Sequence, residues 1–71
     1  MLINYTFIDN RPAYRKLSDA ALRFIVKDAS EAARNMLAIG DASAEAKYLD
    51  QINDATTILA ERARKHLRPS A

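Results

Sequence analysis

The chain has 71 residues, a net charge of +2 and no cysteine. This length bounds it to one domain, residues 1–71, whose core contributes about 3–5 kcal/mol unless the chain assembles. Without cysteine, disulfides and thiolate metal sites are excluded, and a reducing cytoplasm is the expected location. The apolar runs fall far short of the ~20 residues of a membrane span, and the N-terminus lacks the basic start of a secretory signal. We therefore expect no membrane contact.

The first ten residues predict a short β-strand, or arm. Residues 2–8 read LINYTFI, which is rich in β-branched and aromatic side chains, and Ile3, Tyr5 and Phe7 share one face at a period of two. Pro12 and the polar residues before it favour a turn after this segment. Because a single strand has no partner of its own, it is expected to pair with a second copy or to pack against helices.

Residues 18–39 predict the first long helix. Ser18 is a good N-cap, Asp19 follows it where the helix dipole favours an acid, and Gly40 stands where a left-handed residue would end the helix. Apolar residues recur at steps of three and four and form a stripe along one helix face. The stripe comprises Leu22, Ile25, Ala29, Ala32, Met36 and Ile39.

Residues 42–68 predict the second helix, which Asp41 or Ser43 caps and Pro69 stops. Its expected apolar stripe comprises Leu49, Ile52, Thr56, Leu59, Ala63 and Leu67. The connection around Gly40 is only a few residues long, so the two helices must fold back on each other. The fold class is therefore mainly α: an antiparallel two-helix hairpin with a short N-terminal β-strand.

Two continuous apolar stripes on so short a chain predict self-association. Two helices cover only part of each other, and hairpins of this kind commonly pair into four-helix bundles. We expect a homodimer in a four-helix arrangement. The residues expected to support it are Ile3, Tyr5, Phe7, Leu22, Ile25, Met36, Leu49, Ile52 and Leu59.

Two segments of the hairpin resemble a known group of proteins. Residues 22–32 (LRFIVKDASEA) and 46–55 (AKYLDQINDA) are similar to short, uncharacterised helical-hairpin proteins encoded by tailed phages and prophages. The resemblance covers about residues 17–65 and not the N-terminal strand. It implies a phage setting, and with it a host cell cytoplasm, but no activity and no functional residues.

Catalytic and metal-binding patterns are weak in this sequence. His66, the one histidine, falls in the last turn of the second helix, where a cation favours the dipole. Asp50 and Asp54 share a helix face, but we expect that face to be solvated surface. Glycine-rich phosphate loops and the common zinc motifs are absent from the sequence. We therefore expect no enzyme, cofactor or metal site.

Phe24 and Ile58 break the amphipathic pattern of their helices. Each lies roughly 130° from the centre of its stripe, at 100° per residue. In a hairpin closing near Gly40 the two come to nearly the same level and the same side. They predict a second apolar surface for a subunit or a host partner. The alternative is that the N-terminal segment or Tyr14 covers them.

Basic residues gather at one end of the expected hairpin. They precede the first helix and end the second, and an antiparallel arrangement brings these two segments together. Cations at a helix C-terminus complement the dipole, but those before the first helix do not. The predicted basic pole consists of Arg11, Arg15, Lys16, Arg62, Arg64, Lys65 and Arg68. We expect it to contact an acidic partner.

Together these features favour a small non-enzymatic protein-binding module, one that binds and modulates a host protein. One alternative is a dimeric DNA-binding protein of ribbon-helix-helix-like layout, which the order strand, helix, helix permits. Against it, the first helix is long for that fold and residues 2–8 carry no lysine or arginine. A virion or assembly component is the other alternative.

Overall fold

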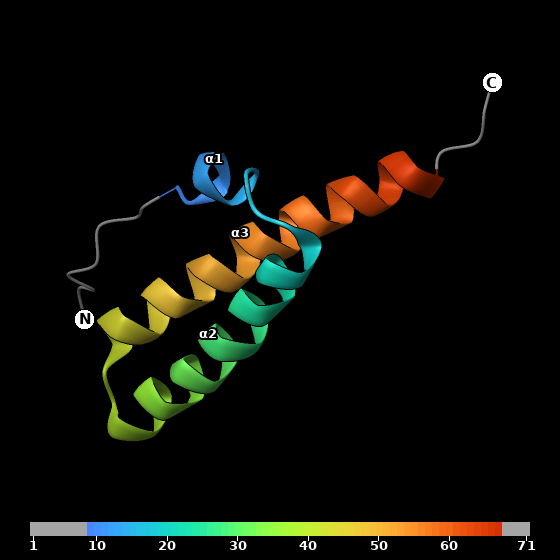
Figure 1. Ribbon diagram of the computed structural model, residues 1–71. Helices are drawn as coiled ribbons and strands as arrows, with labels where there is room; N and C mark the ends of the chain where they lie inside the picture. Colours follow the sequence, from blue (N-terminus) through green and yellow to red (C-terminus); the bar gives the residue numbers. More distant parts are fainter. Residues whose placement is uncertain (1–8, 68–71) are drawn as a thin grey trace.

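The computed structural model describes residues 9–67, of which 86% are helical. The helices are α1 (Arg11–Tyr14), α2 (Asp19–Ile39) and α3 (Ala42–Leu67). Figure 1 shows α2 and α3 lying side by side and antiparallel, with α1 packed over the middle of α3. The strand expected in residues 2–8 lies outside the described residues. No helix within residues 9–67 is long and apolar enough to cross a membrane.

The short helix α1 lies where the sequence predicted only a turn. Pro12 occupies its first turn, where a missing N–H costs nothing, and the Tyr14 N–H donates to the Asn10 carbonyl at 2.9 Å. Asn followed by Pro two residues later is also the signal of a helix start. The segment therefore contained a helix signal that the turn interpretation missed.

Both ends of α2 follow from local residues. The Ser18 hydroxyl accepts a hydrogen bond from the Ala21 N–H at 3.1 Å, which confirms the expected N-cap. Gly40 adopts φ 79° and ψ 20°, and the Asp41 N–H donates to the Met36 carbonyl at 2.9 Å. This is a Schellman motif, which needs a left-handed residue and so favours glycine.

The start of α3 is capped by Asp41 rather than by Ser43. The Asp41 carboxylate accepts a hydrogen bond from the Ala44 N–H at 3.0 Å. Since Gly40 ends α2 and Asp41 starts the cap of α3, the turn between them is very tight. This tightness forces the antiparallel hairpin.

The core of the hairpin is small and lies beneath α1. Leu22, Ala55 and Ile58 form its fully buried cluster, against which Tyr14 and Leu17 pack from the α1 side. Ala29 and Ala33 are also buried and let α2 approach α3 closely. Leu22 was expected to support self-association, and its burial within the single chain contradicts that role.

The buried face of α3 differs from the expected stripe. Asp54, Ala55 and Ile58 are its buried residues, whereas Thr56 and Ala63 are exposed and Leu49 is 49% exposed. The physical reason is that α3 packs against two partners, α2 and α1, so its buried face turns toward α1. On α2 the stripe prediction fails at one end, where Ile39 is 71% exposed.

Candidate partner-binding site

The basic end of the hairpin is assembled by the docking of α1 on α3. The Asn10 N–H donates to Oδ2 of Asp54 at 3.0 Å, and Asp54 is only 2% exposed. Asp54 was expected on solvated surface, which is wrong because this buried contact uses its carboxylate. The bond fixes the start of α1 against α3.

Arg62 joins three segments of the chain at this end. Its Nη1 donates to Oδ1 of Asp19 at 2.7 Å, and its Nη2 donates to the Arg15 carbonyl at 3.1 Å. A second, longer ion pair joins Arg15 Nη2 to Glu61 Oε1 at 3.7 Å. The fork of the guanidinium can make such divergent bonds at once, which holds the end of α1, the start of α2 and α3 in register.

An open groove of about 540 Å³ lies between the end of α1 and the C-terminal half of α3. We call it the pole groove. Ile58 is the one apolar residue of its lining, and the others are charged residues of α3 together with Arg15, the C-cap of α1. Its lining residues are Arg15, Ile58, Glu61, Arg62, Arg64 and Lys65.

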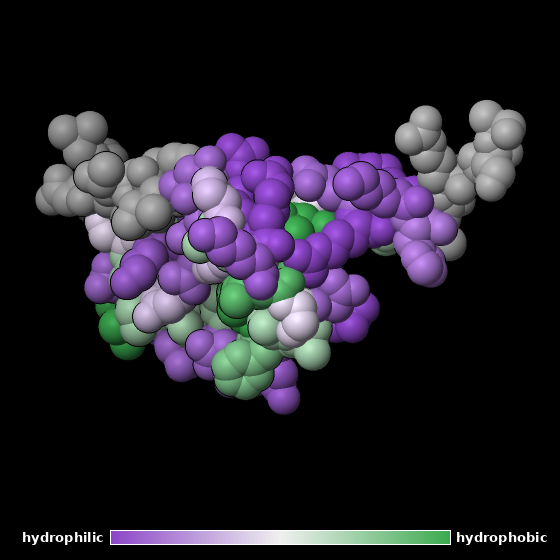
Figure 2. Space-filling view, turned by 45° about the horizontal axis from the view of Figure 1, so that its top comes forward, coloured by the Kyte–Doolittle hydropathy of each residue, from purple (hydrophilic) through white to green (hydrophobic). Residues whose placement is uncertain are grey.

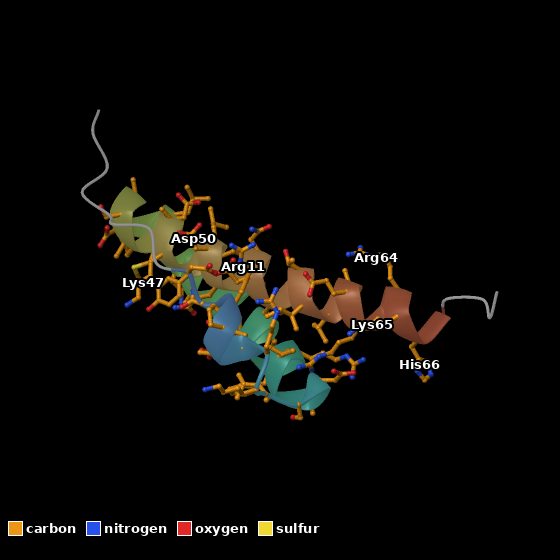
Figure 3. All side chains as sticks on the ribbon, turned by 90° about the horizontal axis from the view of Figure 1, so that it is seen from above. Arg11, Lys47, Asp50, Arg64, Lys65 and His66 are labelled. Atoms are coloured by element: carbon orange, nitrogen blue, oxygen red, sulfur yellow. The ribbon has the colours of Figure 1, made fainter. Side chains whose placement is uncertain are left out.

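The last turns of α3 extend past the start of α2, as Figure 1 shows. Residues 63–66 are all exposed. Figure 3 shows Arg64 and His66 projecting from different sides of this helix end, with Lys65 between them. Arg64 and Lys65 make no ion pair with any carboxylate of residues 9–67. Of the cations that line the groove, they are therefore the two whose charge no carboxylate of residues 9–67 pairs.

The structure brings together part of the predicted basic pole. Arg15, Arg62, Arg64 and Lys65 line the pole groove. Lys16 is exposed next to it in sequence but does not line it. Arg68 lies outside the described residues.

Arg11 also lies apart from the pole groove, in an ion pair with Asp9. The two side chains approach to 2.8 Å, and the Arg11 N–H donates to the same Asp9 oxygen at 3.0 Å. The side-chain hydrogen bond from Arg11 is the main cause that lowers the pKa of Asp9 to about 2. This local pair at the start of α1 occupies the Arg11 guanidinium.

The expected surface of Phe24 and Ile58 does not form. Phe24 is 67% exposed, but Ile58 is 1% exposed and belongs to the core. Tyr14 packs against that core, as the alternative interpretation had it. The prediction for Ile58 as an exposed partner anchor is wrong, because it was made without α1. Figure 2 shows apolar side chains gathered over α2 near α1, with hydrophilic surface around them.

The other residues expected to support self-association fall into two groups. Ile25, Met36, Ile52 and Leu59 are half-buried, and Leu49 is exposed. Ile3, Tyr5 and Phe7 lie outside the described residues.

Acidic and histidine side chains are dispersed over the described residues. No group of three or more His, Cys, Asp or Glu side chains within residues 9–67 could hold a metal ion. His66 is exposed in the last turn of α3, beside the C-terminal carbonyls that favour a cation. What the site does offer is an open groove lined by charged side chains and by the buried Ile58.

No family model matches the chain, and no curated protein or solved structure shows significant similarity to it. The site must therefore be interpreted from its own geometry.

Proposed function

We propose that this protein is a small non-enzymatic binding module whose pole groove holds an acidic segment of a partner protein. The observation that carries the proposal is the convergence of Arg15, the C-cap of α1, with three cations of α3 around one open groove. Intramolecular contacts already hold Arg15 and Arg62 in place, so binding would cost little ordering of these side chains. Arg64 and Lys65 then supply the charge that remains available.

Two features favour a protein partner over a nucleic acid. Glu61 lies in the rim of the groove, and Asp19 is bound to Arg62 at its edge, so the field there is mixed in sign. A phosphate backbone is best bound by a continuous row of cations. A protein segment can instead place carboxylates at Arg64 and Lys65 and neutral groups beside Glu61.

In the phage setting that the sequence resemblance implies, the proposed partner is a host protein, and the module acts by occupying that protein's surface. Affinity would depend on a few well-placed contacts rather than on area. The proposal involves no chemical step.

A direct test uses ¹⁵N-labelled protein titrated with a glutamate-rich peptide and, separately, with duplex DNA of similar charge. We expect the peptide to shift the amide signals of residues that line the pole groove. The double variant Arg64→Glu, Lys65→Glu should lose the interaction. The matched control is Lys27→Glu, Lys47→Glu, which reverses two exposed cations that do not line the groove; it should bind as the unmodified protein does.

Salt dependence separates the two kinds of partner. For DNA the affinity should fall by roughly one log unit per log of salt for each phosphate contact. Tighter binding to DNA with that steep slope would replace our proposal with the DNA-binding one. Binding of neither probe, or equal loss in both double variants, would overturn the pole groove as a site.

A further inference from the structure

The core of the single chain uses only part of the apolar stripe that the sequence predicts on α3. Leu49, Ile52, Leu59 and Ala63 recur at helical spacing along one side of α3. Leu59 packs against the core and Ile52 is half-buried, whereas Leu49 and Ala63 are exposed. An amphipathic stripe normally faces apolar neighbours. Among residues 9–67 this stripe has such neighbours only in part, since Leu49 and Ala63 are exposed.

The same side of the hairpin receives a contribution from α2. Leu37 is 64% exposed and lines a shallow groove of about 250 Å³ together with Leu49 and Ile52. Closer to the basic end, Leu59 and Ala63 line a second groove between α3 and the start of α2. We call the surface formed by Leu37, Leu49, Ile52, Leu59 and Ala63 the hairpin face.

Charge is divided sharply along the hairpin. The half near the turn, residues 28–53, has a net charge of −3, from Asp28, Glu31, Asp41, Glu45 and Asp50 against Arg34 and Lys47. The opposite half, residues 9–27 and 54–67, has a net charge of +4. Its cations are Arg11, Arg15, Lys16, Arg23, Lys27, Arg62, Arg64 and Lys65, and its anions are Asp9, Asp19, Asp54 and Glu61.

We infer that the hairpin face binds a second copy of this chain with the two hairpins pointing in opposite directions. In that orientation the negative half of each copy lies over the positive half of the other. With the hairpins pointing the same way, like charges would face each other along the whole interface. Complementary fields select orientation and disfavour the wrong one. A two-fold axis makes the interface self-complementary, so each favourable contact occurs twice.

This dimer leaves the pole groove open. Of the residues that line the pole groove, Arg62 alone also lines a groove of the hairpin face, whereas Arg15, Glu61 and Arg64 do not. The assembly would therefore present two pole grooves, one at each end of a four-helix arrangement. The inference does not rest on the proposed function, because self-association can be measured without a partner.

The interface is tested by sedimentation across a range of protein concentrations. We expect a dimer, and we expect Leu37→Asp, Leu49→Asp to raise the dimer dissociation constant at least about a hundredfold. Both side chains are exposed, so helix content by circular dichroism should not change. The matched control is Phe24→Asp, Ile39→Asp, which alters two apolar residues that are more exposed than the test pair and lie outside the hairpin face; it should remain dimeric.

The orientation is tested by a nitroxide label on Arg64→Cys, since the chain has no cysteine of its own. Opposed hairpins place the two labels roughly 30–40 Å apart, whereas hairpins pointing the same way place them within roughly 25 Å. A monomeric protein, a short label distance, or dissociation by the control pair would each overturn the inference.

Discussion

The Asn10 N–H and the Asp54 carboxylate form a hydrogen bond of 3.0 Å between residues 44 positions apart. It is the contact that ties α1 to the middle of α3. Because Asp54 is almost fully buried, loss of its carboxylate would leave the Asn10 N–H without a partner.

We predict that Asp54→Ala lowers the free energy of unfolding by about 1–3 kcal/mol, the cost of an unsatisfied buried donor. Amide hydrogens of residues 14–17 should exchange faster, because α1 loses its anchor. Denaturant unfolding and hydrogen exchange measure the two effects. Asp50→Ala, one turn earlier on α3, is the control. Unchanged exchange in Asp54→Ala would show that α1 docks without this bond.

Ile58 and Phe24 should respond oppositely to truncation. Ile58→Ala is expected to destabilise the protein by about 2–5 kcal/mol, since Ile58 lies in the core, and thermal unfolding would measure it. Phe24→Ala should change stability by no more than about 0.5 kcal/mol, because its side chain is exposed. An equal loss of stability from the two substitutions would mean that the Phe24 side chain is buried in the folded protein.

The helix α2 and the position of Ile58 show what can and what cannot be predicted from the sequence. Ser18, Gly40 and the apolar periodicity were sufficient for α2, because caps and helix faces depend on residues close in the chain. The side on which Ile58 lies depends on α1, whose position is set by a contact across 44 residues. The spacing of apolar residues within one helix does not show which other element that helix packs against.

The candidate site likewise has one part that could be predicted from the sequence and one part that could not. The gathering of Arg15, Arg62 and Arg64 at one end follows from the hairpin alone and was predicted. The groove between them requires the docked α1, and the Arg62 bonds to Asp19 and the Arg15 carbonyl are tertiary contacts. The sequence was therefore sufficient to predict where these cations gather, but not the pole groove between them.

Tyr14 provides an optical probe of α1 docking. Burial, with a smaller contribution from the Asp54 charge, raises the pKa of Tyr14 above its ordinary value of 10.0. A raised pKa means that the folded state holds the proton more tightly than the unfolded state. The contribution of the Tyr14 hydroxyl to the free energy of unfolding is therefore fully present below about pH 10. It is lost as the pH rises through the pKa that Tyr14 has in the folded state.

We expect tyrosinate absorbance to contain a component with a raised pKa, and Tyr14→Phe should remove that component. Asp54→Asn should shift it to lower pH, because the neighbouring negative charge is gone. If the late component persists in Tyr14→Phe, it belongs to another of the three tyrosines.

A side chain at position 40 should find enough space, but the backbone conformation there should disfavour residues other than glycine. A Cβ there would meet nothing within 4 Å, yet φ is +79°. Gly40→Ala is therefore expected to cost about 1–2 kcal/mol from backbone strain alone. Gly40→Asn should cost less, since asparagine adopts this conformation more readily. Chemical denaturation of both variants measures the difference, and equal stabilities would argue against strain.

The extension of α3 past α2 has a consequence for the energetics of recognition. Residues 63–66 are exposed, so tertiary packing does little to hold this helix end, and its helix–coil equilibrium depends on intrinsic propensity and on its terminal charges. Arg64 and Lys65 are adjacent cations, so their mutual repulsion offsets part of the stabilisation that each gains from the helix dipole. An anionic ligand would relieve that repulsion and shift the equilibrium toward helix. Binding at this end should therefore be coupled to helix formation, with a gain in ellipticity and an unfavourable entropy of ordering.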